Sequence, residues 1–170
     1  MPPLADDRFS EVFRHHYSQL VRLAGRVLAD VDEAEDAAQE ALLALRTDPV
    51  AERGDEDIAA WLSRVVINGS LNRLRSRRRA DVRAQLVAAR DLRSPQDDPD
   101  ELVVGSYERE RVRASLAVLP DRQATALLLR HAGHSYREIA TALGIAEGSV
   151  GVLLARGERA FRRAHEEMTQ

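Results

Sequence analysis

The sequence predicts an all-α protein of two small helical domains joined by a flexible acidic linker. Hydrophobic residues make up 44% of the 170 residues, enough for a core, while aromatic residues make up only 4%. Apolar residues recur at spacings of three and four along much of the chain, the pattern of amphipathic helices. One acidic, proline-containing stretch separates two such regions. The expected domains are residues 1–89 and 103–170, with the linker at 90–102.

Composition excludes several classes of protein. The chain has no cysteine, so it has no disulfide, no thiolate metal site and no cysteine nucleophile. Its first residues, MPPLADDRF, include acids and lack the apolar run of a signal peptide. No apolar stretch approaches the roughly 20 residues that a membrane span needs. We therefore expect a soluble, cytoplasmic protein that does not insert into a membrane.

The N-terminal region begins with an amphipathic helix, expected at about residues 7–29. An acidic run follows at residues 30–40, with six acids and no base. Asp32, with Glu35 three positions later, resembles an N-cap and its partner, and acids in a first turn favour the helix dipole. This second helix should end before a loop at residues 47–56.

The third helix, expected from about Asp57 to beyond Arg79, is the most basic part of the chain. Between Arg64 and Arg83 there are seven arginines and one acid, a local excess of six positive charges in a protein whose formal net charge is −3. Such a segment indicates a polyanionic partner. Helical spacing places one set of arginine and asparagine side chains on a common face. This set consists of Arg64, Asn68, Asn72, Arg75 and Arg79.

This face of the helix allows two interpretations. An arbitrary run of arginines is often only a solvated helix end. Arginine, however, binds phosphate and guanine, and asparagine binds the edge of adenine. The two aligned asparagines and the density of arginine favour a nucleic-acid contact.

The C-terminal region is expected to contain four helices, of which the last two form a helix-turn-helix. Ser135 and Glu138 have the spacing of a capping box. Gly144 suits the tight turn, Ala140 the close contact between the two helices, and Val150 their core. The expected ranges are about 103–118, 120–131, 135–143 and 147–166.

Catalytic and metal chemistry is not expected. His15 and His16 lie on the first helix, and His131 and His134 flank a glycine, with no third ligand nearby. The acids at residues 32–36 wrap around a helix, so solvated carboxylates are expected there rather than a magnesium site. The sequence has no glycine-rich phosphate loop and no nucleophile motif. We expect no enzyme, no cofactor and no small-molecule substrate.

Three blocks of sequence stand in a recognisable order: EAEDAAQEALLAL at 33–45, AWLSRVVINGSLNRLRSRRR at 60–79 and LPDRQATALLLRHAGHSYREIATALGIAEGSVGVLLARGERAFRR at 119–163. They resemble bacterial sigma factors of the extracytoplasmic-function (ECF) type, in the sigma-70 family, over nearly the whole chain. The resemblance implies an alternative sigma factor, which binds core RNA polymerase and promoter DNA and directs transcription initiation. An anti-sigma factor is a further partner that it allows.

The resemblance also implies roles for surfaces of the first domain. The acidic helix would dock on the clamp coiled coil of the largest polymerase subunits. The loop at 47–57 would capture a flipped base of the −10 element beside the basic helix. The docking residues would be Asp32, Glu33, Glu35, Asp36, Gln39 and Glu40. The −10 residues would be Trp61, Arg64, Asn68, Asn72, Arg75, Arg78 and Arg79.

The second domain would contact the −35 element and the polymerase flap, and the acidic linker would follow the RNA path. The −35 residues would be Ser135, Tyr136, Arg137, Gly148, Ser149, Arg156 and Arg159. The chain departs from the family at several positions, which are Glu52 and Ile58 in place of aromatic residues, Ala146 in place of a serine N-cap, and Gly151, Val152 and Leu153 in place of polar residues of the recognition helix. These departures predict phosphate binding more than base reading at −35.

Two other functions remain open at this point. A sigma-like decoy would sequester an anti-sigma factor without binding a promoter, and the apolar recognition helix favours it. The asparagines of the basic helix argue against it, because a decoy has no use for them. An ordinary helix-turn-helix repressor is the other alternative, but it would not need the acidic run at 30–40.

Overall fold

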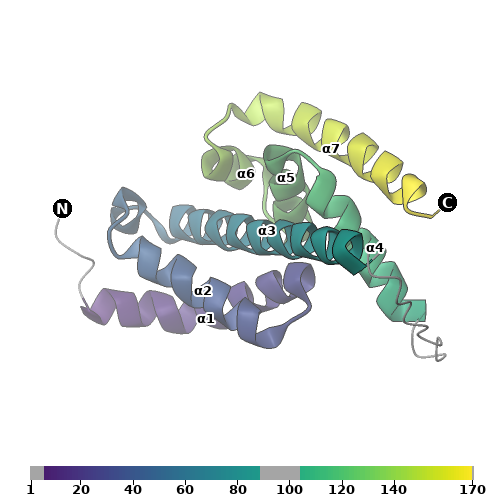
Figure 1. The fold of residues 1–170 in the computed structure, drawn as a ribbon. Coiled ribbons are helices and arrows are strands. Elements are labelled where there is room, and N and C mark those ends of the chain that lie inside the picture. The colour runs from purple at the N-terminus through teal and green to yellow at the C-terminus, as the bar shows by residue number, and fades with distance from the viewer. Residues whose placement is uncertain (1–5, 89–103, 170) are drawn as a thin grey trace.

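The computed structural model describes residues 6–88 and 104–169, and all regular structure within them is helical (Figure 1). The all-α prediction is confirmed. The predicted helix ends agree with the observed ones to within two residues, apart from the end of the third helix, which was expected beyond Arg79 and lies at Ala88. The predicted linker at 90–102 lies outside the described residues. The elements are α1 (Asp6–Leu28), α2 (Val31–Leu45), the 3-10 helix η1 (Pro49–Glu52), α3 (Asp55–Ala88), α4 (Val104–Val118), α5 (Asp121–His131), α6 (Tyr136–Leu143) and α7 (Glu147–Glu167).

The first three helices share a core of small and medium side chains. Ala24 and Val27 of α1, Ala38 and Leu42 of α2, and Ile67 of α3 are all fully buried. Alanines at these contacts let the helices approach closely without aromatic filling, which is why a chain so poor in aromatic residues still has a core. The α1–α2 pair therefore holds one side of α3 in place.

The predicted N-cap of α2 at Asp32 is wrong by two residues. The observed N-cap is Asp30, whose backbone is extended and whose side chain accepts a 3.0 Å hydrogen bond from the Glu33 amide. Ala29 directly before it has a φ of 57°, a left-handed conformation that turns the chain between α1 and α2. The sequence repeats the Asp-x-x-Glu pattern at 30 and at 32, and only this turn decides which of the two caps the helix.

The helix-turn-helix prediction is confirmed. Ser135 and Glu138 form a reciprocal capping box at the start of α6. Gly144 closes α6 with a φ of 61°, a left-handed conformation that glycine adopts without steric cost. The axes of α6 and α7 meet at 90°. Ala140 and Val150 are buried between them, as the pattern predicted.

The long helix α3 runs between two layers of helices (Figure 1). The α1–α2 pair packs on one side of it, and α4, α5 and α6 pack on the other. The last helix, α7, packs on α4, α5 and α6 and lies farthest from α3. Residues far apart in sequence, from the two predicted domains, therefore meet along the length of α3.

Within the described ranges, no single helix is both long and apolar enough to cross a membrane, and only the bent pair α6–α7 passes that test when its helices are counted together.

Candidate nucleic-acid and protein interfaces

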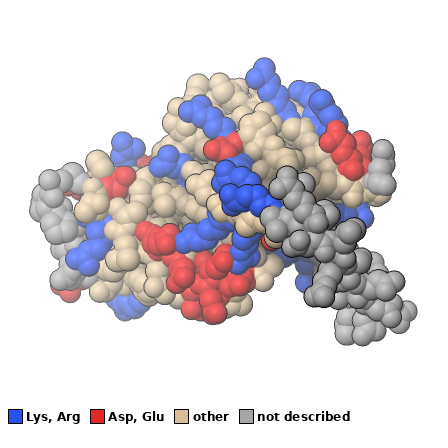
Figure 2. All heavy atoms as spheres, in the orientation of Figure 1, with Lys and Arg blue, Asp and Glu red and all other residues tan. Residues whose placement is uncertain are grey.

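The outer face of α2 is acidic and open. Asp32, Glu35, Asp36 and Gln39, all predicted docking residues, are exposed there. Figure 2 shows acidic side chains gathered over α2, with basic side chains of neighbouring elements beside them. The exposed Leu43, 58% accessible, adds an apolar contact at the end of the same helix. This face combines negative charge with an uncovered apolar side chain, which suits a basic protein partner.

Two predicted docking residues are instead engaged within the molecule. Glu33 forms an ion pair with Arg77 of α3, and Arg77 also lies 3.5 Å from Asp30. Glu40 pairs with Arg73 of α3 at 2.7 Å. These pairs tie α2 to α3, so the free charge of the acidic face comes from its other carboxylates.

Two further arginines of α3 bind the second helical layer. Arg75 donates from Nε to the carbonyl of Ala117 at 2.9 Å and from Nη2 to the carbonyl of Leu119 at 2.8 Å, and it forms an ion pair with Asp121. Arg78 donates to the carbonyl of Ala114 at 2.6 Å. The carboxyl end of a helix has carbonyls without helical partners and a negative dipole end, so cations are stabilised there. Arg75 therefore caps α4.

The two asparagines of the predicted α3 face, Asn68 and Asn72, differ in their surroundings. The Oδ1 atom of Asn68 accepts a 2.8 Å hydrogen bond from the hydroxyl of Thr125 on α5, although much of Asn68 stays exposed. Asn72, one turn further on, is exposed. Three of the predicted −10 residues, Asn68, Arg75 and Arg78, therefore contact the C-terminal layer in this arrangement. Asn72 and Arg79 are open to solvent.

Arg64 and Trp61 line a hollow of about 410 Å³ between η1, α3 and the end of α6. Both side chains are half-buried, and the Nε of Arg64 is buried without a hydrogen-bond partner among the described residues. Arg53 and Asp57 also line this hollow, and Gly144 closes it from the side of the helix-turn-helix. The loop expected to capture a base thus lies beside Trp61, but the C-terminal layer covers part of its opening.

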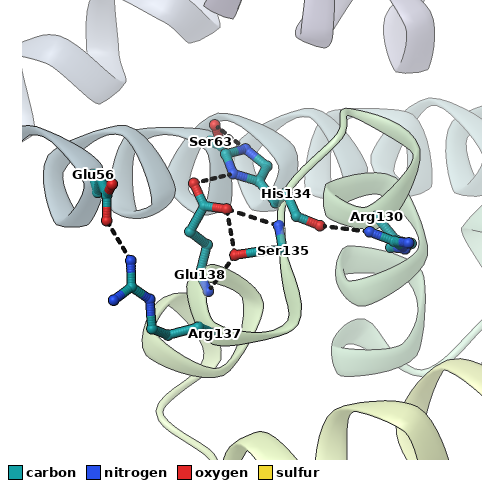
Figure 3. A network of polar contacts seen from close by, with 7 residues as sticks. All are labelled: Glu56, Ser63, Arg130, His134, Ser135, Arg137 and Glu138. Atoms are coloured by element: carbon teal, nitrogen blue, oxygen red, sulfur yellow. Dashed lines mark hydrogen bonds and ion pairs between the residues drawn. The ribbon is translucent and has the colours of Figure 1, made fainter.

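The start of α6 sits on α3 through a polar network (Figure 3). The buried ring of His134 lies 3.0 Å from the Ser63 hydroxyl of α3 and 3.5 Å from Glu138. Arg137 pairs with Glu56 at the start of α3 at 2.6 Å. Hydrogen bonds from the side chain and then the backbone of Ser135 lower the pKa of Glu138. Of the predicted −35 residues, Arg137 therefore contacts α3 through Glu56, while Ser135 is exposed and caps its own helix through Glu138.

The other predicted −35 residues are exposed as well. Tyr136 is exposed and lies under the guanidinium of Arg130, whose carbon is 5.5 Å from the ring centre. The others lie on the exposed face of α7 and are Gly148, Ser149, Arg156 and Arg159. Because α7 is the helix farthest from α3, this face stays open while part of the α3 face is covered.

Sequence reasoning missed the residues that join the layers. Glu56, Ser63, Thr125 and His134 all contribute polar contacts between α3 and the C-terminal layer. Ser63, Thr125 and His134 lie within the blocks that carry the family resemblance, but nothing in their residue type or spacing indicates a contact between the layers. The described residues also contain no group of three or more acidic, histidine or cysteine side chains arranged to hold a metal.

Comparison with known families and proteins identifies both regions. The family described as sigma-70 region 2 matches residues 12–80, and the family described as sigma-70, region 4 matches residues 109–161. The chain is 33% identical to the ECF RNA polymerase sigma factor SigM of Mycobacterium tuberculosis over 162 residues, covering 94% of this chain and 79% of SigM. It is 26% identical to the ECF sigma factor SigW of Bacillus subtilis, covering 92% of this chain and 88% of SigW.

A solved structure shares the fold. The sigma factor RpoE of Bartonella quintana, solved in complex with the anti-sigma factor NepR, matches with a TM-score of 0.55 at 20% identity, over 95% of this chain and 98% of that one. The two regions thus occur in the same order as in the relatives, on a helical fold of the same kind. The chain belongs to the sigma-70 family, as a sigma factor of the ECF type.

Proposed function

We propose a division of labour among the surfaces of this sigma factor, which binds core RNA polymerase and directs transcription initiation at specific promoters. In this proposal α2 docks on core polymerase, α3 binds the melted −10 strand, and α7 contacts the −35 duplex. It acts as a binding subunit in the cytoplasm rather than as an enzyme. The observation that supports it best is that an open acidic face on α2 lies beside basic side chains of neighbouring elements (Figure 2).

Docking on polymerase is assigned to the carboxylates of α2 that have no internal partner. Asp32 and Asp36 are one turn apart, exposed, and free of ion pairs within the described part of the chain. A basic partner would meet their charge without first breaking a contact inside the protein. Glu33 and Glu40 are less available, because Arg77 and Arg73 already neutralise them.

Charge reversal tests this assignment. The variant Asp32→Arg/Asp36→Arg should lose most of its affinity for core polymerase, since it turns attraction into repulsion at the rim of an interface. The matched control Asp7→Arg/Glu11→Arg makes the same change one turn apart on the exposed face of α1. Affinity is measured by fluorescence anisotropy, and thermal melts establish that both variants fold. Equal affinity of the two variants would refute docking through α2.

Binding of the −10 strand is assigned to α3 after the two layers separate. The guanidinium of Arg75 and the Oδ1 atom of Asn68 are not free to contact DNA while Ala117, Leu119 and Thr125 engage them. A side-chain amide can both donate to and accept from an exposed base edge, so the asparagines suit discrimination among bases. The arginines suit attraction to the backbone, because neutralising phosphate does not depend on sequence.

Contact with the −35 element is assigned to the exposed arginines of α7. The first turns of α7 present Gly148, Ser149 and Val152, which offer few long polar groups to base edges. Arg156 and Arg159 follow, and both are exposed. Replacing either should weaken −35 binding across sequences and reduce the salt slope by about one. Loss of affinity for a single base pair alone would instead show direct base readout.

A decoy that only sequesters an anti-sigma factor is the second candidate. Two observations favour it: the apolar start of α7, and the likeness in fold to a sigma factor solved with its anti-sigma factor. Run-off transcription with purified core polymerase separates the two. A sigma factor yields promoter-dependent transcripts, whereas a decoy binds a partner and yields none.

A further inference from the structure

We propose that a cleft between α1 and α4 binds a small polyphosphate anion, of the pyrophosphate or nucleoside triphosphate class, and that this anion bridges the two helical layers. The cleft has a volume of about 480 Å³. Arg22 and Arg26 reach it from α1, and Arg109 and Arg113 reach it from α4. It therefore brings together four guanidinium groups from the two regions of the chain that match separate family domains.

The positive charge of the cleft is balanced only in part by the described residues of the protein. Its one acidic lining residue, Glu108, is engaged by Arg111 at 3.0 Å and by His165 at 3.3 Å. Arg22, Arg26 and Arg109 form no ion pair within residues 6–88 and 104–169. Arg113 is paired with Glu110, so the local excess of positive charge comes from the other three arginines.

Arg113 gives a second, independent sign of a missing partner. Its side chain is only 14% exposed, and its Nη1 atom lies 3.5 Å from Glu110. Its Nε atom is buried with no hydrogen-bond partner among the described residues. A buried donor without an acceptor is destabilising, so an acceptor supplied by a ligand would be stabilising.

Phosphate is the chemistry that fits these groups. The planar guanidinium donates two parallel hydrogen bonds to phosphate oxygens, and four such groups match the several oxygens of a diphosphate or triphosphate. Val112 and Gly25 supply the non-polar part of the lining, which excludes water from one side of the ligand and strengthens the ion pairs. A cleft of this volume lies within the range of small-ligand sites.

Binding would favour the closed arrangement, in which the C-terminal helical layer packs on α3, over an open arrangement, in which the two layers are separated. Without a ligand, the arginines of α1 and α4 repel one another across the cleft, and an anion between them replaces that repulsion by attraction on both sides. A ligand that binds one arrangement better shifts the population towards it. In the closed arrangement Arg75 is held by α4, so the anion and the melted −10 strand would compete. This last consequence rests on the proposed function, whereas the binding site does not.

Titration of inorganic triphosphate into the full chain, followed by calorimetry at fixed low salt, tests the site. The wild type should bind triphosphate. The affinity of Arg22→Gln/Arg109→Gln should be lower by about tenfold or more, because each substitution removes charged hydrogen bonds to the anion. The control Arg14→Gln/Arg122→Gln removes the same charge from exposed positions, one in each domain, and should bind as the wild type does. The proposal would be overturned if the wild type did not bind triphosphate, or if both variants lost affinity equally. It would also be overturned if a DNA duplex bound through Arg22 and Arg109 more tightly than triphosphate does.

Energy transfer between two fluorophores tests the bridging role. The chain has no cysteine, so Thr47→Cys on the first layer and Glu166→Cys on α7, both exposed, give one unique labelled pair. Triphosphate should raise transfer efficiency in the wild type and leave it unchanged in Arg22→Gln/Arg109→Gln. Binding without any change in transfer would refute the bridging role. Failure of promoter-dependent transcription would refute the proposed function but not the anion site, because the calorimetric and energy-transfer assays both use free protein.

Discussion

Arg75 is predicted to hold the two helical layers together, and Arg75→Ala should open them. The substitution removes two hydrogen bonds to backbone carbonyls, at 2.9 and 2.8 Å, and the ion pair with Asp121. In the open arrangement water can donate hydrogen bonds to those carbonyls. The substitution therefore destabilises the closed arrangement and not the open one. The core positions of α3 are untouched, so the helix itself should stay folded.

The magnitude follows from the contacts. A hydrogen bond from a charged donor contributes about 1.5–3 kcal/mol. The Asp121 side chain is 76% exposed, so its pair with Arg75 adds less than about 1 kcal/mol. Because part of the guanidinium already meets water, we expect a total of about 2–4 kcal/mol against closure, which is about 30-fold to 1,000-fold in the equilibrium between closed and open protein.

The assay is energy transfer between labels at Thr47→Cys and Glu166→Cys in the free protein. Transfer efficiency should fall in Arg75→Ala. It should not change in Arg79→Ala, because Arg79 is exposed and its one hydrogen bond, at 3.4 Å, is to Ser76 on its own helix. Unchanged transfer in a folded Arg75→Ala protein would refute the claim that this arginine latches α3 to α4.

Three other predictions address single residues. Asn72→Ala should lower open-complex formation by about 1–3 kcal/mol without lowering the melting temperature, since Asn72 is exposed and an amide–base contact has about this value; permanganate reactivity and thermal melts measure the two effects. Burial and then the neighbouring His15 lower the pKa of His16, with Asp55 opposing. As pH falls through about 6.5, the unfolded chain therefore takes up a proton at this histidine before the native protein does. Stability should drop there in the wild type but less in His16→Leu. Ala29→Gly should raise the free energy of unfolding by about 1 kcal/mol, because Ala29 has a left-handed φ of 57° that glycine adopts without strain, and denaturant melts should show the gain.

The elements of this fold could be predicted because each has a local signal. The capping box at Ser135, the glycine turn at Gly144 and the buried Ala140 and Val150 were all recognisable from residue type and spacing. The N-cap of α2 could not be assigned, because Asp30 and Asp32 present the same pattern. What separates them is the backbone of Ala29, a residue type that gives no sign of a left-handed turn.

The candidate site was predictable in its residues but not in its contacts. A count of charge predicts that the arginines of α3 face a polyanion. In the structure Arg73 and Arg77 pair with α2, while Arg75 and Arg78 bind carbonyls of the C-terminal layer. Carbonyl acceptors have no signature in a sequence, because every residue has one. The contact between the layers therefore had to be seen in three dimensions.

The central claim, that the α3 face reads the melted −10 strand, is tested most directly by permanganate footprinting with reconstituted holoenzyme. A suitable promoter is found by sequencing the transcripts that this holoenzyme makes from genomic DNA. Asn68→Ala/Asn72→Ala removes both amides. It also removes the hydrogen bond between Asn68 and Thr125, which joins the two layers. A defect in promoter opening therefore cannot come from layers that separate less readily than in the wild type.

Wild-type holoenzyme should make the thymines of the −10 element reactive to permanganate. The double variant should bind core polymerase equally well and leave those thymines largely unreactive. Full reactivity of the thymines with the double variant would contradict the account.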